Sequence, residues 1–141
     1  MIKLGGRTAI VTGSSSGMGA EIAKALAAEG MSVMLAARRT ERLEAIAGEI
    51  VAAGGKAFVH AADCTLEDEV ETLFRAADER LGRIDLLVNS TGVPQATPID
   101  QMSLDEWRTV IDANLTSVFL ASREALKRMK AQGRGRIVSI G

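Results

Sequence analysis

Short apolar runs alternate along this chain with stretches in which apolar residues recur every three or four positions. The runs are rich in valine and isoleucine, which is typical of strands in a parallel sheet covered on both faces. The recurring stretches are typical of helices that bury one face. The predicted strands are Thr8–Thr12, Ser32–Ala37, Lys56–Ala61, Ile84–Val88 and Arg136–Ile140.

The predicted helices lie between these strands. The longest has an apolar stripe that begins with Trp107, continues through Leu115 and Phe119, and runs on to about Met129. Thr65 with Asp68, and Ser103 with Glu106, have the spacing of capping boxes. Alternating strands and helices of this kind wind into an α/β fold, a Rossmann-type doubly wound parallel sheet of five strands in the order 3-2-1-4-5. We expect a single domain over residues 1–141.

A glycine-rich turn joins the first predicted strand to the first helix, in the sequence Thr12-Gly-Ser-Ser-Ser-Gly-Met-Gly19. Its first glycine allows a tight turn, its second leaves room for a pyrophosphate, and its third lets the helix press onto the strand. The helix N-terminus offers free N–H groups to phosphates. The alternative is a tight turn without a ligand. The predicted dinucleotide-binding residues here are Gly13, Ser15, Ser16, Gly17, Met18 and Gly19.

The end of the second predicted strand indicates which dinucleotide binds. A site for NAD places an acidic residue there, near twenty residues past the glycines, to bind the ribose 2′-hydroxyl. This chain has Ala37 at that place, followed by Arg38 and Arg39. Guanidinium groups match a 2′-phosphate in charge and geometry. We therefore predict NADP(H) as the coenzyme, with two solvated loop arginines as the alternative.

Asp63 and Cys64 follow the third predicted strand. We expect both residues at the coenzyme site, where a carboxylate can accept a hydrogen bond from an adenine amine. Asp63 is equally well interpreted as a turn residue, and Cys64 as a small packing residue. His60 and Cys64 are the only histidine and cysteine, so we predict no metal site.

The fourth predicted strand leads into Asn89-Ser-Thr-Gly92, at the edge of the sheet where ligands bind. We expect Asn89, Ser90 and Gly92 to lie at the coenzyme, although an ordinary turn is the alternative. Asn114 interrupts the apolar stripe of the longest helix. A buried amide there must be satisfied, either by its own helix backbone or by a functional role at the active site.

Composition narrows the function classes. Charges nearly cancel, with 17 Lys+Arg against 18 Asp+Glu, so we expect no nucleic-acid partner. No apolar run reaches the length of a membrane span, and we expect no membrane association. A single cysteine excludes an internal disulfide and fits a reducing compartment, so the expected location is cytoplasmic.

Together these motifs resemble the short-chain dehydrogenase/reductase family over essentially all 141 residues. The glycine turn resembles its coenzyme loop, Asp63 its adenine-binding acid and Arg38 the basic position of its NADP-preferring members. Asp112-Ala-Asn-Leu115 matches the segment that carries the family's catalytic asparagine. The resemblance implies that Asn114 is catalytic in a proton relay, that the substrate is a small carbonyl or alcohol, and that the full-length protein is a homo-oligomer, a dimer or a tetramer.

Two departures from the family stand out. Ser90 and Thr91 replace Asn and Ala of its Asn-Asn-Ala-Gly motif. The chain also contains no tyrosine, so the family's catalytic Ser, Tyr and Lys have no assigned counterparts. The last predicted strand would form an open, apolar sheet edge without lysine or proline. We therefore expect these residues to be the first part of a longer protein, with the C-terminal part of the family fold absent.

Three functions are compatible with these features. The first is an NADP(H)-dependent oxidoreductase that reduces a carbonyl or oxidises a secondary alcohol by hydride transfer. The second is a non-catalytic NADP(H)-binding module, which would explain the missing tyrosine. The third, an S-adenosylmethionine-dependent enzyme, is disfavoured by Arg38 and Arg39, because that ligand has no phosphate.

Overall fold

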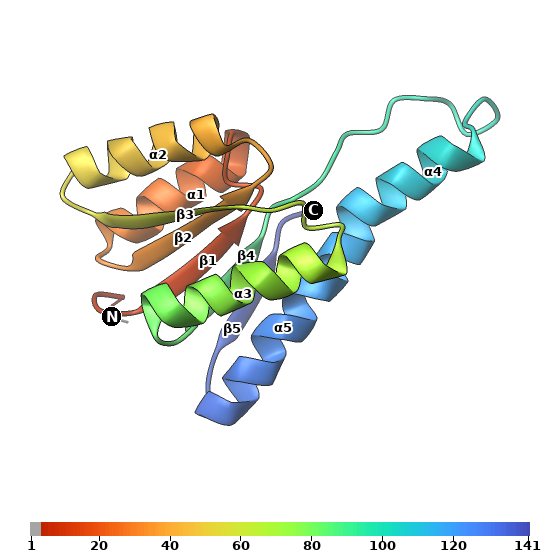
Figure 1. Cartoon of the computed structure of the whole chain (residues 1–141). Coiled ribbons are helices and arrows are strands. Elements are labelled where there is room, and N and C mark those ends of the chain that lie inside the picture. The colour runs from red at the N-terminus through yellow and green to blue at the C-terminus, as the bar shows by residue number, and fades with distance from the viewer. Residues whose placement is uncertain (1–3) are drawn as a thin grey trace.

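A computed structural model describes residues 4–141 and contains one parallel sheet of five strands in the order β3-β2-β1-β4-β5 (Figure 1). The predicted fold class and strand order are confirmed. The strands are β1 (Thr8–Thr12), β2 (Ser32–Ala37), β3 (Lys56–Ala61), β4 (Leu86–Asn89) and β5 (Arg136–Ser139). The helices are α1 (Gly17–Ala28), α2 (Thr40–Ala52), α3 (Glu67–Leu81), α4 (Leu104–Ile111) and α5 (Ser117–Gln132), with a π-helical turn, η1 (Asp112–Thr116), between the last two.

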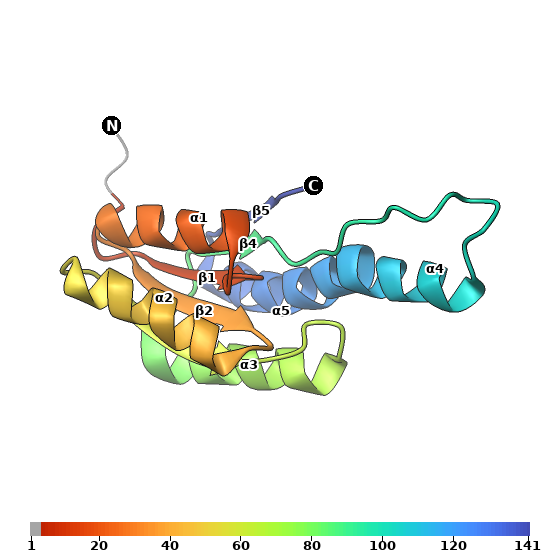
Figure 2. The ribbon, with the colours of Figure 1, turned by 90° about the horizontal axis from the view of Figure 1, so that it is seen from above.

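The sheet is covered on both faces (Figure 2). On one face α1 and α2 pack over a cluster that includes Ala9, Val11 and Leu43. On the other face α3 and α5 pack over a cluster that includes Ile10 and Phe74. Because successive residues of β1 point to opposite faces, this strand supplies both cores. All five β1 residues are buried, which explains the continuous apolar run in the sequence.

Three strands begin and end where the sequence predicts, whereas two are shifted. β4 begins at Leu86 instead of Ile84, because the Asp85 carboxylate accepts a hydrogen bond from the Thr8 backbone N–H at 3.1 Å. β5 ends at Ser139, although the Ile140 N–H still donates to the Asn89 carbonyl. β5 forms the edge of the sheet, and all its residues are exposed. In the described range no helix is both long and apolar enough to cross a bilayer.

The long predicted helix is present, but the prediction for its buried face is wrong. Trp107, Leu115 and Phe119 are 49%, 60% and 55% exposed. The buried face of α5 instead consists of Ser117, Leu120, Ala121, Glu124, Ala125 and Met129. The π-turn is a wider turn than an α-turn, and it lies between the two helical segments. The apolar stripe that the sequence displays is therefore a surface feature.

One of the two predicted capping boxes is confirmed. The Ser103 hydroxyl accepts a hydrogen bond from the Glu106 N–H, and the Glu106 carboxylate accepts one from the Ser103 N–H. The Thr65–Asp68 box is wrong, because the Thr65 hydroxyl donates to Asp63 and α3 begins only at Glu67.

A buried carboxylate joins α5 to its own basic residues and, through them, to α3. Glu124 is 5% exposed, and it pairs with Lys127 at 2.5 Å and with Arg128 at 3.0 Å. Arg128 also binds Asp78 of α3 at 2.8 Å. Burial acts to raise the pKa of Glu124, but the hydrogen bonds and charges of Lys127 and Arg128 outweigh it and leave the pKa below its ordinary value of 4.5.

We predict that Glu124→Gln lowers the free energy of unfolding at neutral pH by about 1–3 kcal/mol, because Arg128 and Lys127 lose a buried charged acceptor. Since the folded-state pKa lies below 4.5, this contribution is present above pH 4.5 and is lost as the pH falls through the folded-state pKa. The variant should therefore lose less stability than the wild type on acidification, as measured by urea unfolding at several pH values.

Glu67→Gln is the matched control, because Glu67 pairs with Arg123 at the surface and its side chain is 60% exposed. It should cost less than about 1 kcal/mol. Equal losses in the two variants would contradict a special role for the buried carboxylate.

Candidate nucleotide-binding site

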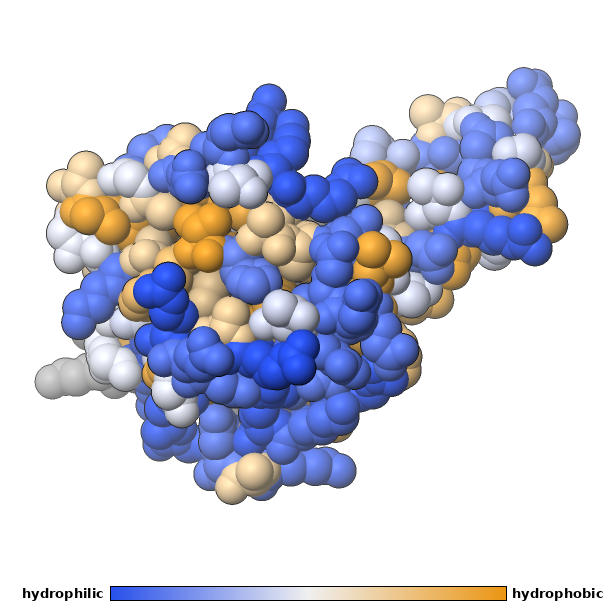
Figure 3. All heavy atoms as spheres, viewed as in Figure 1, coloured by the Kyte–Doolittle hydropathy of each residue, from blue (hydrophilic) through white to orange (hydrophobic). Residues whose placement is uncertain are grey.

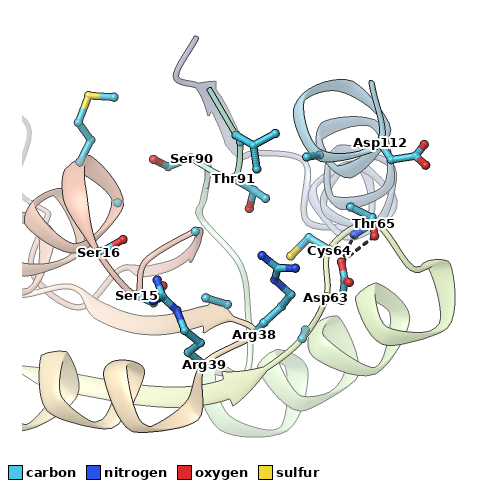
Figure 4. A pocket seen from close by; sticks show the side chains of 18 of the residues that line it. Ser15, Ser16, Arg38, Arg39, Asp63, Cys64, Thr65, Ser90, Thr91 and Asp112 are labelled. Atoms are coloured by element: carbon cyan, nitrogen blue, oxygen red, sulfur yellow. Dashed lines mark hydrogen bonds between the residues drawn. The ribbon is translucent and has the colours of Figure 1, made fainter. Parts of the chain in front are cut away.

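A cleft of about 550 Å³ lies at the carboxyl ends of the strands, where the chain leaves β1 and β4 in opposite directions (Figure 4). Ligands of open α/β sheets bind at such a point. Most of the predicted site residues line this cleft: Gly13, Ser15, Ser16, Met18, Gly19, Arg38, Arg39, Asp63, Cys64, Ser90 and Gly92. Gly17, Asn89 and Asn114 do not line it.

The glycine turn is held by backbone contacts that leave no room for side chains. Gly13 has φ +65°, and a Cβ there would lie 2.5 Å from the Ser90 carbonyl oxygen. A Cβ on Gly19 would lie less than 3.0 Å from the Gly13 carbonyl oxygen, so the helix presses onto the turn itself. Gly17 has φ +57° and faces open space. Only glycine fits the first and third positions without displacement of the backbone.

The N-terminus of α1 faces the cleft with donors available. Ser16 is its N-cap residue, and the Ser16 hydroxyl forms no capping hydrogen bond. The first-turn N–H groups therefore keep their capacity to bind an anion. Ser14 is completely buried and exchanges hydrogen bonds with Ala36 of β2, so it fixes the turn to the sheet instead of facing a ligand.

Two arginines enter the cleft from the end of β2. Arg38 points toward the cleft centre near Asp63 and Cys64, whereas Arg39 extends toward Ser15 (Figure 4). Within residues 4–141 neither guanidinium forms a salt bridge. Both groups are thus available to an anionic ligand.

Asp63 combines the two interpretations that the sequence left open. Its Oδ1 accepts hydrogen bonds from the Thr65 N–H at 2.9 Å and the Thr65 hydroxyl at 2.7 Å, so it is a turn residue. It also lines the cleft. Partial burial acts to raise the pKa of Asp63, but the hydrogen bonds from Thr65 and the charge of Arg38 outweigh it and leave the pKa below 3.8. The carboxylate is therefore ionised at neutral pH and can accept further hydrogen bonds.

The side chains of Cys64 and Asn89 contact other parts of the protein: Cys64 packs in the core, and Asn89 forms hydrogen bonds to α5 and β5. Burial raises the pKa of the Cys64 thiol to about 11, and the side chain packs in the cluster under α3 and α5. Asn89 is 2% exposed, and its Nδ2 donates to Ser122 of α5 at 3.1 Å and to Ser139 of β5 at 3.2 Å. Asn89 therefore joins two elements behind the cleft.

Asn114 lies in the π-turn, and the expectation that it is buried is wrong, because the side chain is exposed. Its Oδ1 accepts a hydrogen bond from the Val93 N–H at 3.0 Å, and its Nδ2 donates to the Val93 carbonyl at 3.1 Å. Both amide atoms thus bind the loop after β4, not the helix backbone. A Cβ on Gly92 would lie less than 3.0 Å from the Asn114 Oδ1, which explains the glycine.

Comparisons with known proteins agree with this geometry. The family described as short chain dehydrogenase matches residues 7–141. This chain belongs to that family. A 3-oxoacyl-(acyl-carrier-protein) reductase from Synechocystis sp. is 40% identical over 99% of the chain and 57% of the reductase. A 3β-hydroxysteroid dehydrogenase from Eggerthella lenta is 42% identical over 87% of the chain and 48% of the dehydrogenase.

Solved structures extend the similarity to three dimensions. A metagenomic short-chain oxidoreductase in complex with NADP has a TM-score of 0.94 and 40% identity, over 99% of this chain and 64% of that one. An actinorhodin polyketide ketoreductase with NADPH has a TM-score of 0.93 and 38% identity, over 96% and 52% of the two chains. The chain thus spans about half the length of the curated relatives it matches.

Several cleft residues were missed by sequence reasoning: Ala62, Thr65, Thr91, Val93, Thr109, Asp112 and Ala113. Thr91 and Val93 could have been found, because they flank Gly92 at the end of β4. Thr109, Asp112 and Ala113 share one face of a helix, at the three- and four-residue spacing. The sequence does not indicate that this helix face lines the cleft, because the contact depends on how the helix packs in three dimensions.

We predict that Gly19→Ala destabilises the chain by about 1–3 kcal/mol, because the new methyl group would overlap the Gly13 carbonyl, which is backbone and cannot rotate away. Denaturant unfolding measures the change. Gly48→Ala, at an exposed helical position with nothing within 4 Å, is the matched control and should stabilise by up to about 1 kcal/mol. A Gly19→Ala variant as stable as the wild type would contradict the close contact.

Proposed function

We propose that this chain binds NADP(H) in the cleft and belongs to an oxidoreductase that interconverts a carbonyl and a secondary alcohol. One observation carries the proposal: the glycine turn at the α1 N-terminus lines the same cleft as the guanidiniums of Arg38 and Arg39, which form no salt bridge within residues 4–141. The first suits a pyrophosphate and the second suits a 2′-phosphate. The two similar structures that were solved with NADP and NADPH support this assignment.

The residues present fit such a coenzyme. Gly13 and Gly19 hold the turn tightly against its neighbours, Gly17 faces open space and leaves room for the pyrophosphate, and Ser15 and Ser16 offer hydroxyl donors beside it. The Asp63 Oδ1 is occupied by Thr65, and we assign its second oxygen to the adenine amine. Ser90 and Gly92 border the cleft on the side of β4. The coenzyme, when bound, supplies the hydride.

We assign Asn114 the role of a positioning residue in this reaction. Its amide binds both backbone groups of Val93 and thereby holds the loop after β4 against the π-turn. That loop borders the cleft through Gly92 and Val93. Asn114 thus sets the shape of the place where a substrate would meet the coenzyme. The family's acid/base tyrosine has no counterpart among the 141 residues.

A non-catalytic NADP(H)-binding module is the second candidate, because the glycine turn and the two arginines would bind the coenzyme whether or not a reaction follows. Oxidation of NADPH in the presence of ketones distinguishes the two, because only the first candidate consumes NADPH. We further propose a small-molecule substrate, self-association into a homo-oligomer and a cytoplasmic location, the last because the one cysteine is a free, buried thiol.

We predict that the wild-type chain binds NADPH more tightly than NADH, and that Arg38→Ala weakens NADPH binding about 10- to 100-fold, because a charge-assisted hydrogen bond contributes about 1.5–3 kcal/mol. NADH binding should change little, because NADH has no 2′-phosphate. Calorimetric titration with both coenzymes gives the four Kd values.

Arg42→Ala is the control, because Arg42 is an exposed α2 residue outside the cleft and should leave both Kd values unchanged. Equal or tighter binding of NADH by the wild type would overturn the proposed coenzyme.

A further inference from the structure

Met18 is the most exposed apolar side chain that lines the cleft. The cleft opens between the start of α2 and the arm formed by α4, where the molecular surface is hollowed (Figures 1 and 3). Met18 is the second residue of α1, and it is 65% exposed. Both of its neighbours in the sequence are glycines, so no adjacent side chain shields its thioether. The sulfur is therefore open to small molecules that enter the cleft.

The other sulfur atoms in residues 4–141 are less accessible. Three methionines are 6% exposed or less: Met31, Met34 and Met129. Met102 is half-buried and lies outside the cleft. Cys64 is 4% exposed, and burial raises the pKa of its thiol to about 11, so the reactive thiolate is scarce at neutral pH. Among the sulfur-containing side chains that the structure describes, an oxidant in solution thus reaches Met18 most easily.

Oxidation of Met18 changes the chemistry at the anion-binding end of α1. A peroxide transfers one oxygen atom to the thioether sulfur, which is oxidised to a sulfoxide, while the peroxide is reduced to water or an alcohol. Helical side chains point toward the N-terminus of their helix, so the sulfoxide oxygen lies on the side of the first-turn N–H groups. This oxygen is a polar acceptor that competes with a phosphate for those N–H groups, and its partial negative charge repels the phosphate.

We propose that Met18 is a reversible oxidation site through which peroxides weaken coenzyme binding. The proposal rests on the proposed function, because it requires a dinucleotide at the α1 N-terminus. A thiol-dependent methionine sulfoxide reductase restores the thioether: two thiols are oxidised to a disulfide, and the oxygen leaves as water. Because both coenzymes contain the pyrophosphate, oxidation weakens the binding of NADPH and NADH alike, unlike the Arg38→Ala substitution.

Peroxide treatment, followed by peptide mass spectrometry and calorimetric titration, tests the proposal. In the wild-type chain the peptide that contains Met18 should gain the mass of one oxygen atom before the peptides that contain the buried methionines. The Kd values for NADPH and NADH should then both rise about 3- to 10-fold, the factor that one lost hydrogen bond represents. Methionine sulfoxide reductases with a dithiol should reverse both changes. Bound NADP⁺ should slow the oxidation, because it occupies the cleft.

Met18→Leu is the decisive variant, because leucine is similar in volume to methionine and has no sulfur. Peroxide should leave its Kd values as they were before treatment. Met102→Leu is the matched control, because it removes a methionine outside the cleft, and it should respond to peroxide as the wild type does. An equal response of Met18→Leu to peroxide would contradict the proposal.

Two further results would also count against this role of Met18. One is a Met18 sulfoxide that leaves both Kd values unchanged, and the other is oxidation of the buried methionines ahead of Met18. If the untreated chain binds neither coenzyme, the proposed function fails and this coupling fails with it. That result is distinguishable from coenzyme binding that survives oxidation, which overturns only the role of Met18.

Discussion

The structure depends on one close approach of backbone to backbone. Where β1 ends, the Gly13 backbone packs against the Ser90 carbonyl. Gly19, in the first turn of α1, packs against the Gly13 carbonyl. A side chain at Gly13 would displace the segment after β4, and a side chain at Gly19 would displace α1 from the turn. The contact brings the N-terminus of α1, which the Ser16 hydroxyl does not cap, to the crevice between β1 and β4, where Ser15 and Ser16 line the cleft. An anion-binding end therefore results from packing and requires no charged side chain.

The rest of the cleft follows from the sheet order. Since all five strands run parallel, the segments after β2, β3 and β4 meet at the same edge, and they bring Arg38, Asp63 and Ser90 together from distant parts of the chain. Two side-chain clamps then fix the loops: Thr65 holds Asp63, and Asn114 holds Val93. In the described part of the chain Arg38 and Arg39 form no salt bridge, so their guanidiniums are available to an anionic ligand in the cleft.

Much of this arrangement could be predicted from sequence because local rules determine it. β1 is fully buried and β2 is buried at its four central residues, so both appear in the sequence as continuous runs, and the glycines of the turn stand where the backbone leaves no room for a side chain. The failures share a different cause. Periodicity showed that Trp107, Leu115 and Phe119 lie on one face of a helix, but not whether protein or solvent meets that face. The partner of Asn114 is 21 residues away, so no local pattern contains it. The Thr65 hydroxyl donates a hydrogen bond to Asp63 instead of forming the predicted capping box.

A crystal structure of this chain with NADPH tests the central claim most directly. The account predicts the pyrophosphate above the N-terminus of α1, the adenine beside Asp63 and the 2′-phosphate in contact with Arg38 or Arg39. Coenzyme bound elsewhere, or density showing the glycine turn closed and both arginines in solvent, would contradict it.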